Sequence, residues 1–228
     1  MAVNMKNLVV QVVGMFVVLG LILFAAAGTV AWPGGWAFLI LFCLFTVAIS
    51  AWLVKSNPGL LTERLGGTIR RDQRPWDRAI TILANILFLA WLIVMPLDAV
   101  RFGWSQAPGW LQIVGAGLLL VSFYLFFLTF RENSYLSPVV RIQEERQHVA
   151  ITTGPYRYVR HPMYAAVIPF ALGASLLMGS YAGVLPALLL VAVIARRAVL
   201  EEDTLREELP GYREYMRQTR YRLIPGVW

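Results

Sequence analysis

The chain has little charge, little histidine and almost no cysteine. Only 14% of its 228 residues are charged while 58% are hydrophobic, whereas about a quarter of the residues of a soluble domain are charged. The single cysteine, Cys43, excludes an intramolecular disulfide. One cysteine and two histidines cannot build a conventional Cys/His zinc site, so we expect no metal.

Several common catalytic and nucleotide-binding motifs are also missing. The sequence has no GxGxxG after a strand, no GxxxxGK[ST] loop and no GxSxG segment. These absences argue against a Rossmann dinucleotide fold, a P-loop and a hydrolase nucleophile elbow. No serine is placed to act as a nucleophile with His148 or His161.

Long apolar runs, in contrast, are abundant. About 20 apolar residues in a helix cross a bilayer, so we predict an all-α, polytopic integral membrane protein with about six hydrophobic helices. The last two runs are short and are joined only by "GSY", which predicts a helical hairpin that need not span fully. The first run lacks a signal-peptide cleavage pattern, so we expect a retained helix. The six runs are 8–30, 36–54, 79–97, 110–130, 163–179 and 182–200.

The positive charges are distributed unevenly around these runs. If the N-terminus is cytoplasmic and the segments alternate, every Lys and Arg except Arg101 lies on the cytoplasmic side. This is the positive-inside pattern, and it predicts a cytoplasmic N-terminus, C-terminus and C-terminal helix. The net charge of +7 therefore reflects topology, with attraction to anionic lipid headgroups as a secondary effect, and does not indicate nucleic-acid binding.

We divide the chain into N-terminal scaffold helices, 1–108, and a core, 109–228, that carries the polar motifs. The basic loop 55–78 is interpreted either as topogenic charge or as the lining of a substrate entrance. Gly115 and Gly117 favour close helix packing. The polar connection 131–162 is long for a membrane protein, which is typical of functional loops, and its segment "HVAITTGPY" could form a short extended piece.

A dense polar and aromatic motif, "GPYRYVRHPMYAA", precedes the fifth apolar run. Pro162 suits the first position of a helix, which places His161 at the N-cap, where helix N–H groups favour an anion. Arg160 offers a planar fork for a carboxylate or phosphate. Tyr156, Tyr158 and Tyr164 could surround a ring or a cation. Isolated residues of these types are usually membrane anchors, but so many at one helix start favour a site.

A second cluster, at the end of the sixth run, contains Arg196, Arg197, Glu201 and Glu202. Arg197 and Glu201 are four residues apart, so a helix-stabilising ion pair is the simplest interpretation. If the last two apolar runs are antiparallel neighbours, however, both clusters meet at one membrane face. Ionisable groups gathered at such a face indicate a functional site, which the C-terminal tail would cover.

These residues resemble a known family. "GPYRYVRHPMYAA", followed by an apolar hairpin and "EEDTLREELPGYREYMRQTRYRLIPGVW", resembles the isoprenylcysteine carboxyl methyltransferase family, and phospholipid methyltransferases share a similar pattern. The resemblance covers roughly residues 115–228. Its core is Arg160-His161-Pro162-x-Tyr164, Glu201-Glu202 and Tyr212-x-x-Tyr215. Ala166 stands where many relatives have glycine.

The resemblance implies an integral-membrane methyltransferase of bacterial or archaeal type, in the bacterial inner or plasma membrane. Its cofactor would be S-adenosylmethionine and its acceptor a lipophilic or lipidated molecule. The residues implied as catalytic, because they orient the acceptor or lie near it, are Arg197, Asn133 and Arg160. Those implied to bind or support the cofactor are Gly154, Tyr156, Arg160, His161, Tyr164, Glu201, Glu202, Leu205, Tyr212 and Tyr215.

Two other classes remain open from the sequence. Membrane NADPH-dependent reductases of the sterol or steroid type also end in basic, tyrosine-rich tails with a finish similar to Leu223-Ile224-Pro225. A non-catalytic membrane assembly protein would explain the helices without a cofactor. The methyl acceptor could be a carboxylate, amine or thiol. The spacing between "GPY" and "RHP" favours methyl transfer.

Overall fold

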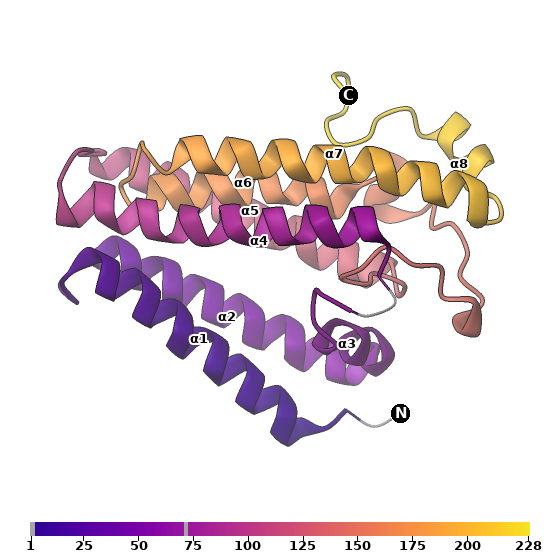
Figure 1. Ribbon diagram of the computed structural model, residues 1–228, viewed down its shortest axis with the longest axis horizontal. Helices are drawn as coiled ribbons and strands as arrows, with labels where there is room; N and C mark the ends of the chain where they lie inside the picture. The colour runs from indigo at the N-terminus through magenta and orange to yellow at the C-terminus, as the bar shows by residue number, and fades with distance from the viewer. Residues whose placement is uncertain (1–2, 71–72) are drawn as a thin grey trace.

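The apolar runs form long helices, as expected for chains that must satisfy their backbone hydrogen bonds inside a bilayer. The computed structural model describes residues 3–70 and 73–228, and this part of the chain contains helices and loops but no strand (Figure 1). The elements are α1 (Met5–Ala27), α2 (Pro33–Ser56), α3 (Pro58–Leu65), α4 (Pro75–Pro96) with its π-helical extension η1 (Leu97–Arg101), α5 (Gly109–Glu132), η2 (Glu144–Arg146), η3 (Gly154–Arg157), α6 (Pro162–Leu177), α7 (Val184–Glu208) and α8 (Tyr212–Gln218).

Four of these helices are long and apolar enough to cross a membrane: α1, α2, α4 with η1, and α5. The predicted polytopic, all-helical class is confirmed. The fifth run forms α6, which has 16 residues and a length of about 24 Å, shorter than a typical hydrocarbon core of about 30 Å. The sixth run forms α7, which has 25 residues but is charged from Arg196 onward. Neither α6 nor α7 is therefore a typical membrane-spanning helix, in agreement with the prediction that the hairpin need not span fully.

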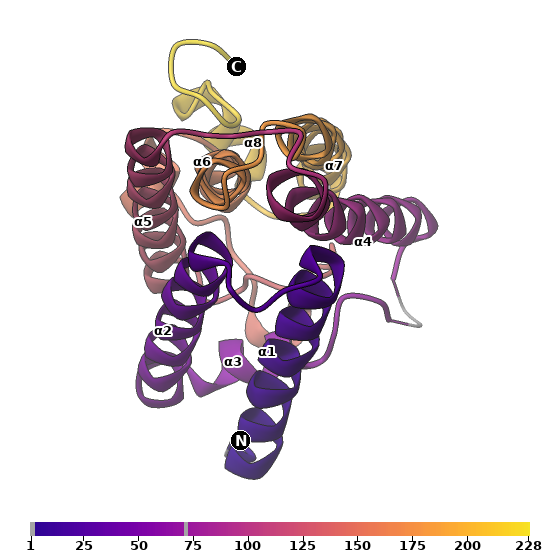
Figure 2. The same ribbon diagram turned by 90° about the vertical axis from the view of Figure 1, so that its left-hand side faces the viewer.

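The helices pack around one large apolar cluster. It contains Leu23 of α1, Phe38 of α2, Trp91 of α4 and Phe170 of α6, so it joins both of the segments that we separated at residue 108. That division stays a prediction. Figures 1 and 2 show α1 and α2 as a pair on one side of the layer formed by α4, α5, α6 and α7.

Glycine lets α5 and α6 approach closely. A methyl group on Gly115 would overlap the backbone of Gly173 and Leu177, so only a glycine fits there. Gly117 was expected to serve the same purpose, but no atom of the described residues lies within 4 Å of the position a Cβ would take there. That prediction was wrong because Gly117 faces away from α6, two residues and thus about 200° further round the helix.

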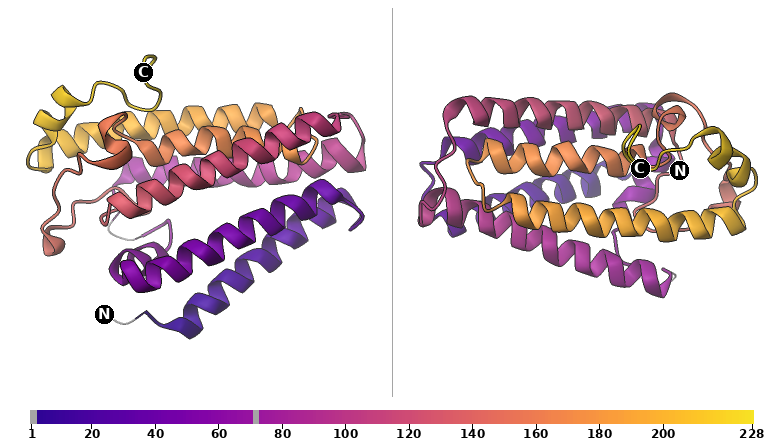
Figure 3. Two further views of the ribbon diagram at one scale, coloured as in Figure 1. Left: turned by 180° about the vertical axis from the view of Figure 1, so that it is seen from behind. Right: turned by 90° about the horizontal axis from the view of Figure 1, so that it is seen from above.

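Charged and hydrogen-bonded polar residues gather at the two ends of the helix bundle. At one end Arg101 approaches Gly28, and the fully buried Asp98 accepts hydrogen bonds from Ser105 and Ser180. The opposite end holds both termini, α3 and α8 (Figure 3). This separation agrees with the charge asymmetry of the sequence, while which end faces the cytoplasm stays a prediction.

Two local expectations differ from the structure. The loop 55–78 contains α3, because Asn57 caps its first turn by accepting the Leu60 N–H, and because Leu60 and Leu61 are buried. Part of its basic cluster, Arg71, lies outside the described residues. "HVAITTGPY" pairs with no strand, and its end instead forms the 3₁₀ turn η3.

Candidate functional site

The Arg160-His161-Pro162 turn is held by both the chain around it and the C-terminal tail. His161 is the N-cap residue of α6 and Pro162 its first helical residue, as predicted. The backbone N–H groups of Arg160 and His161 donate to the carbonyls of Tyr221 and Arg222, each at 2.9 Å. The tail therefore lies directly against the start of α6.

Glu202 ties this turn to α7. Arg160 donates to Glu202 from Nε at 2.6 Å and from Nη2 at 3.1 Å, and its Nη1 donates to the carbonyls of Thr219 and Arg220 at 2.8 Å. His161 Nε2 lies 3.2 Å from Glu202, and Arg222 Nε donates to it at 2.8 Å. Burial opposes ionisation of Glu202, but these hydrogen bonds and charges lower its pKa to about 2.

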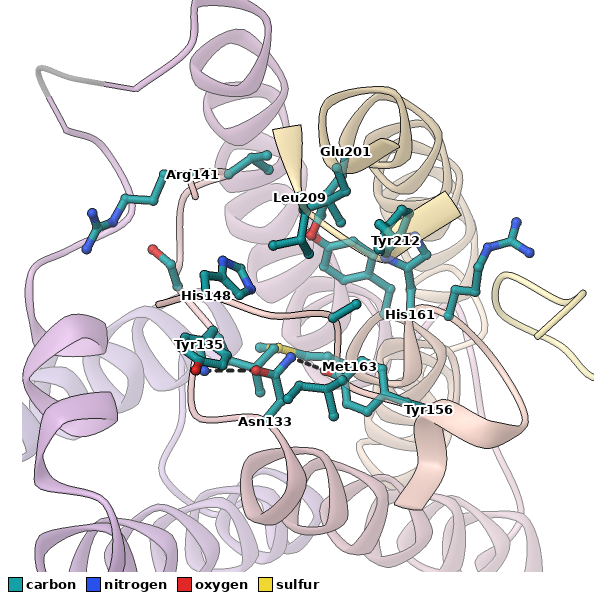
Figure 4. A pocket seen from close by; sticks show the side chains of 18 of the residues that line it. Asn133, Tyr135, Arg141, His148, Tyr156, His161, Met163, Glu201, Leu209 and Tyr212 are labelled. Atoms are coloured by element: carbon teal, nitrogen blue, oxygen red, sulfur yellow. Dashed lines mark hydrogen bonds between the residues drawn. The ribbon is translucent and has the colours of Figure 1, made fainter. Parts of the chain in front are cut away.

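A cavity of about 230 Å³ lies next to this network, and Arg160 and His161 border it. All of the residues that the family resemblance implied border it except Gly154 and Glu202, whereas Tyr158 and Arg196 of the two sequence clusters do not. The structure brings together Asn133, Tyr156, Arg160, His161, Tyr164, Arg197, Glu201, Leu205, Tyr212 and Tyr215. Figure 4 shows several of them converging from α7, α8 and the 133–161 connection.

The two exceptions hold residues that border the cavity. Glu202 binds the side chains of Arg160 and His161, as described above. Gly154 has φ +57°, and a Cβ there would overlap the side chain of Glu132. Its conformation starts η3 and so places Tyr156.

One wall of the cavity is aromatic and comes from the tail. Tyr156, Leu209, Tyr212 and Tyr215 form a buried cluster of their own. Asn133 donates to Tyr156 Oη at 2.8 Å, and Tyr215 donates to the Tyr156 carbonyl at 2.8 Å (Figure 4 draws the first). Tyr212 is 4% exposed, and its hydroxyl has no hydrogen-bond partner among the described residues. A buried polar atom without a partner at a cavity wall indicates a place for a ligand.

The carboxylate of Glu201 lies in the same cavity. Tyr164 donates its hydroxyl to Glu201 at 2.6 Å and stacks on His161, with ring centres 5.5 Å apart and planes 3° apart. Glu201 thus presents negative charge toward the cavity, which suits a cationic or hydroxylated ligand.

The spacing of four residues predicted an ion pair between Arg197 and Glu201, but Arg197 binds other partners. Its Nε donates to Asp77 at 2.9 Å and its Nη2 to the Pro138 carbonyl at 2.8 Å. Asp77 is fully buried and also accepts from Gln73 and the Val140 N–H. Asp77 of α4 therefore takes the place of Glu201 as the partner of Arg197, and this ion pair holds the Arg197 guanidinium at the cavity.

Sequence reasoning offered loop 55–78 as a possible lining of a substrate entrance but singled out neither Asp77 nor Arg64, and it did not place His148 at the site. An aspartate at the start of an apolar helix, in "RPWD", was the available signal for Asp77. Arg64 borders the cavity from α3, which was expected to be loop. His148 stacks on Tyr135 with ring centres 4.4 Å apart, and burial together with Arg146 lowers its pKa to about 4.

The fold and this site define a class: a helical membrane protein with a charged, aromatic cavity at one end of the bundle. Residues 110–210 match the family model for phospholipid methyltransferases. The chain is 34% identical over 70 residues to a protein-S-isoprenylcysteine O-methyltransferase of Schizosaccharomyces pombe, covering 30% of each chain. It is also 35% identical over 114 residues to a dipeptide and tripeptide permease A of Erwinia pyrifoliae, covering 48% of this chain and 22% of the permease.

The chain thus spans less than a third of the curated relatives it matches. The family-model match lies in the segment that carries the Arg160-His161-Pro162 turn and Glu201-Glu202. The resemblance to membrane methyltransferases of the isoprenylcysteine and phospholipid type is confirmed by these two matches.

Proposed function

We propose that the protein transfers a methyl group from S-adenosylmethionine to a lipophilic acceptor. The observation that carries this proposal is one cavity that gathers the residues of the methyltransferase motif from η3, the Arg160-His161 turn, α6, α7 and α8, with Asn133 at the C-cap of α5. The family match supports the reaction type, while the cofactor and the acceptor class are our inference.

The residues around the cavity fit this cofactor. Its adenosine and methionine parts carry hydroxyl, amino and carboxylate groups, and the reactive sulfonium is a cation. Tyr212 offers a buried hydroxyl that no described residue pairs with, and Glu201 offers a carboxylate. Tyr156 and Tyr215 offer aromatic surface in the same wall. When bound, the cofactor supplies an activated methyl group on sulfur.

The protein's own contribution is orientation and the exclusion of water. Methyl transfer requires an acceptor atom held in line and close, which can lower the barrier substantially without acid or base. Arg197, fixed by Asp77, can orient an acceptor carboxylate. Leu205 and Leu209 close the cavity toward the tail. Asn133 is committed to Tyr156 and Tyr135, so it positions the aromatic wall.

An amine or thiol acceptor would need a base as well. Glu201 is the candidate, because its carboxylate borders the cavity and accepts only a tyrosine hydroxyl among the hydrogen bonds of the described residues. His161 is less suited, since its Nε2 already faces Glu202 at 3.2 Å.

The cavity lies at the end of the bundle that holds the termini and most arginines. By the positive-inside rule we place this end, and both termini, in the cytoplasm of a bacterial inner or plasma membrane. A water-soluble cofactor would then enter from the cytosol, and the acceptor from the bilayer.

Calorimetry with S-adenosylhomocysteine, the product of the cofactor, tests the proposal. We expect the detergent-purified protein to bind it, and Glu201→Gln to weaken binding by at least several-fold because a charge-assisted contact is lost. Glu207→Gln removes an exposed carboxylate from the same helix and should change nothing. Absence of binding by the wild type, with NADPH bound instead, would favour the reductase alternative.

The other candidates have less in their favour. The family match favours methyl transfer over a sterol-type reductase or a non-catalytic assembly protein. The match to the permease leaves most of that transporter's length uncovered, so we do not propose peptide transport.

A further inference from the structure

The N-terminal segment, outside the family match, contributes an arginine to the cavity. Arg64 lies on α3 and borders the cavity together with Met163 and Leu136. Its guanidinium carbon lies 4.8 Å from the centre of the Phe130 ring. The side chain is partly exposed, and its guanidinium is held against an aromatic face.

Arg64 has an unused donor. Its Nη1 atom is buried and has no hydrogen-bond partner among the described residues. Leaving a charged donor unpaired in a buried place is costly. Burial, with repulsion from Arg197, lowers the pKa of Arg64 to about 10, so the group still carries its charge at neutral pH.

The nearby carboxylates are already engaged by other groups. Glu63, next in the chain, accepts from Ser137 at 2.8 Å and pairs with Arg70 and Arg141. Asp77 pairs with Arg197. Glu201, the other carboxylate at the cavity, accepts a hydrogen bond from Tyr164. Among the described residues, Arg64 is therefore a cation at the cavity that forms no ion pair with a carboxylate.

The cavity surface near Arg64 is apolar and is formed by Leu136 and Met163. Both residues pack against a buried cluster that contains Leu60 and Leu61 of α3 and Phe130 of α5. This wall is distinct from the tyrosine wall of the tail, which forms a separate cluster. Among the described residues, the same cavity thus has a tyrosine hydroxyl without a partner on the side of the tail, and a guanidinium nitrogen without a partner on the side of Leu136 and Met163.

We propose that Arg64 binds the oxyanion of an amphiphilic acceptor, a carboxylate or a phosphate, whose apolar chain contacts Leu136 and Met163. This inference rests on the proposed methyl transfer and specifies its substrate class: an acceptor with a negative charge near the reacting atom, in preference to a neutral lipid. α3 is then a specificity element supplied by the N-terminal segment. Arg64 binds the acceptor, and the tyrosine wall serves the cofactor.

The test uses the full chain in lipid nanodiscs, with empty nanodiscs as the blank. Calorimetric titrations with octanoate and octyl phosphate probe the two oxyanions, and octyl glucoside is the neutral amphiphile of equal chain length. S-adenosylhomocysteine is titrated separately. The variants are Arg64→Met, Arg64→Lys and Arg78→Met, of which the last removes an exposed arginine that does not border the cavity.

We expect Arg64→Met to weaken binding of one or both anions by about tenfold to a hundredfold, the effect of losing a charged hydrogen bond. Arg64→Lys should keep much of the affinity, and Arg78→Met all of it. Affinity for octyl glucoside and S-adenosylhomocysteine should change less than about twofold. The anion that loses more identifies the headgroup as carboxylate or phosphate.

Stability separates this role from a structural one. Removing a buried charge without a partner should leave the melting temperature of Arg64→Met unchanged or raise it. Unchanged anion binding in Arg64→Met would overturn the proposal. So would a lowered melting temperature, or a parallel loss of S-adenosylhomocysteine, which would assign Arg64 to the fold or to the cofactor. If the wild type binds anions through Arg64 but never binds S-adenosylhomocysteine, the anion site stands and the methyltransferase proposal fails.

Discussion

Replacing Tyr212 by phenylalanine separates ligand binding from folding at the aromatic wall. The substitution removes one oxygen and keeps the ring, which packs against Tyr215 with ring centres 5.6 Å apart. The oxygen is buried without a partner among the described residues. If a ligand supplies the missing partner, the hydroxyl costs stability in the free protein and contributes affinity in the complex.

Both effects can be given a size. An unpaired buried hydroxyl costs about 1–3 kcal/mol, and about 1 kcal/mol shifts the melting temperature of a chain this long by roughly 2–4 °C. We therefore expect free Tyr212→Phe to melt several degrees higher than the wild type. A neutral hydrogen bond contributes about 0.5–1.5 kcal/mol, so affinity for S-adenosylhomocysteine should fall about two- to tenfold.

Thermal unfolding and calorimetry of the protein in one detergent measure the two quantities. Tyr158→Phe is the matched control, because Tyr158 is 69% exposed and does not border the cavity. It should change neither value. A Tyr212→Phe protein that melts lower than the wild type and binds S-adenosylhomocysteine unchanged would refute the reasoning, because the hydroxyl would then stabilise the fold.

Three further predictions concern packing and charge. Gly115→Ala should destabilise the protein by about 1–3 kcal/mol through overlap with α6, whereas Gly117→Ala, in open space, should be neutral or stabilising; equal effects in thermal unfolding would contradict the packing. Glu202→Gln should cost about 3–5 kcal/mol because it leaves buried arginines unpaired, while Asp203→Asn should cost less than about 0.5 kcal/mol. Folding lowers the pKa of Glu63 and Glu202 to about 2. The two ionised carboxylates therefore stabilise the folded protein fully above a pH of about 4.5, and this stabilisation is lost as the pH falls toward 2. A melting temperature that stays constant between these pH values would contradict the prediction.

The helices of the membrane region could be predicted from the sequence because hydrophobicity and length are local properties. The four long helices lie within a few residues of the apolar runs. The Pro162 helix start was also predicted, since proline acts on its own backbone. α3 was missed because eight residues are too few for a clear periodic signal, and its stability depends on burying Leu60 and Leu61.

Much of the candidate site could be predicted because its residues cluster in short motifs around Arg160 and Glu201. The motif could not distinguish which side chains border the cavity and which support it. Glu201 and Glu202 are adjacent in sequence, yet Glu202 binds Arg160 outside the cavity, whereas Glu201 borders the cavity. The roughly 100° turn between successive helical residues explains the difference, but only the neighbours of α7 decide which is which.

The sequence by itself determined the class of protein: its apolar runs, its arginine distribution and its methyltransferase motif are written in local composition and spacing. Only the tertiary structure decided the partners of the charged groups. Arg197 pairs with Asp77, 120 residues away, in place of Glu201, and Arg64 reaches the cavity from a segment without a motif. The physical reason is that a buried charge takes the partner that packing brings within hydrogen-bond distance, and that distance depends on how the helices pack.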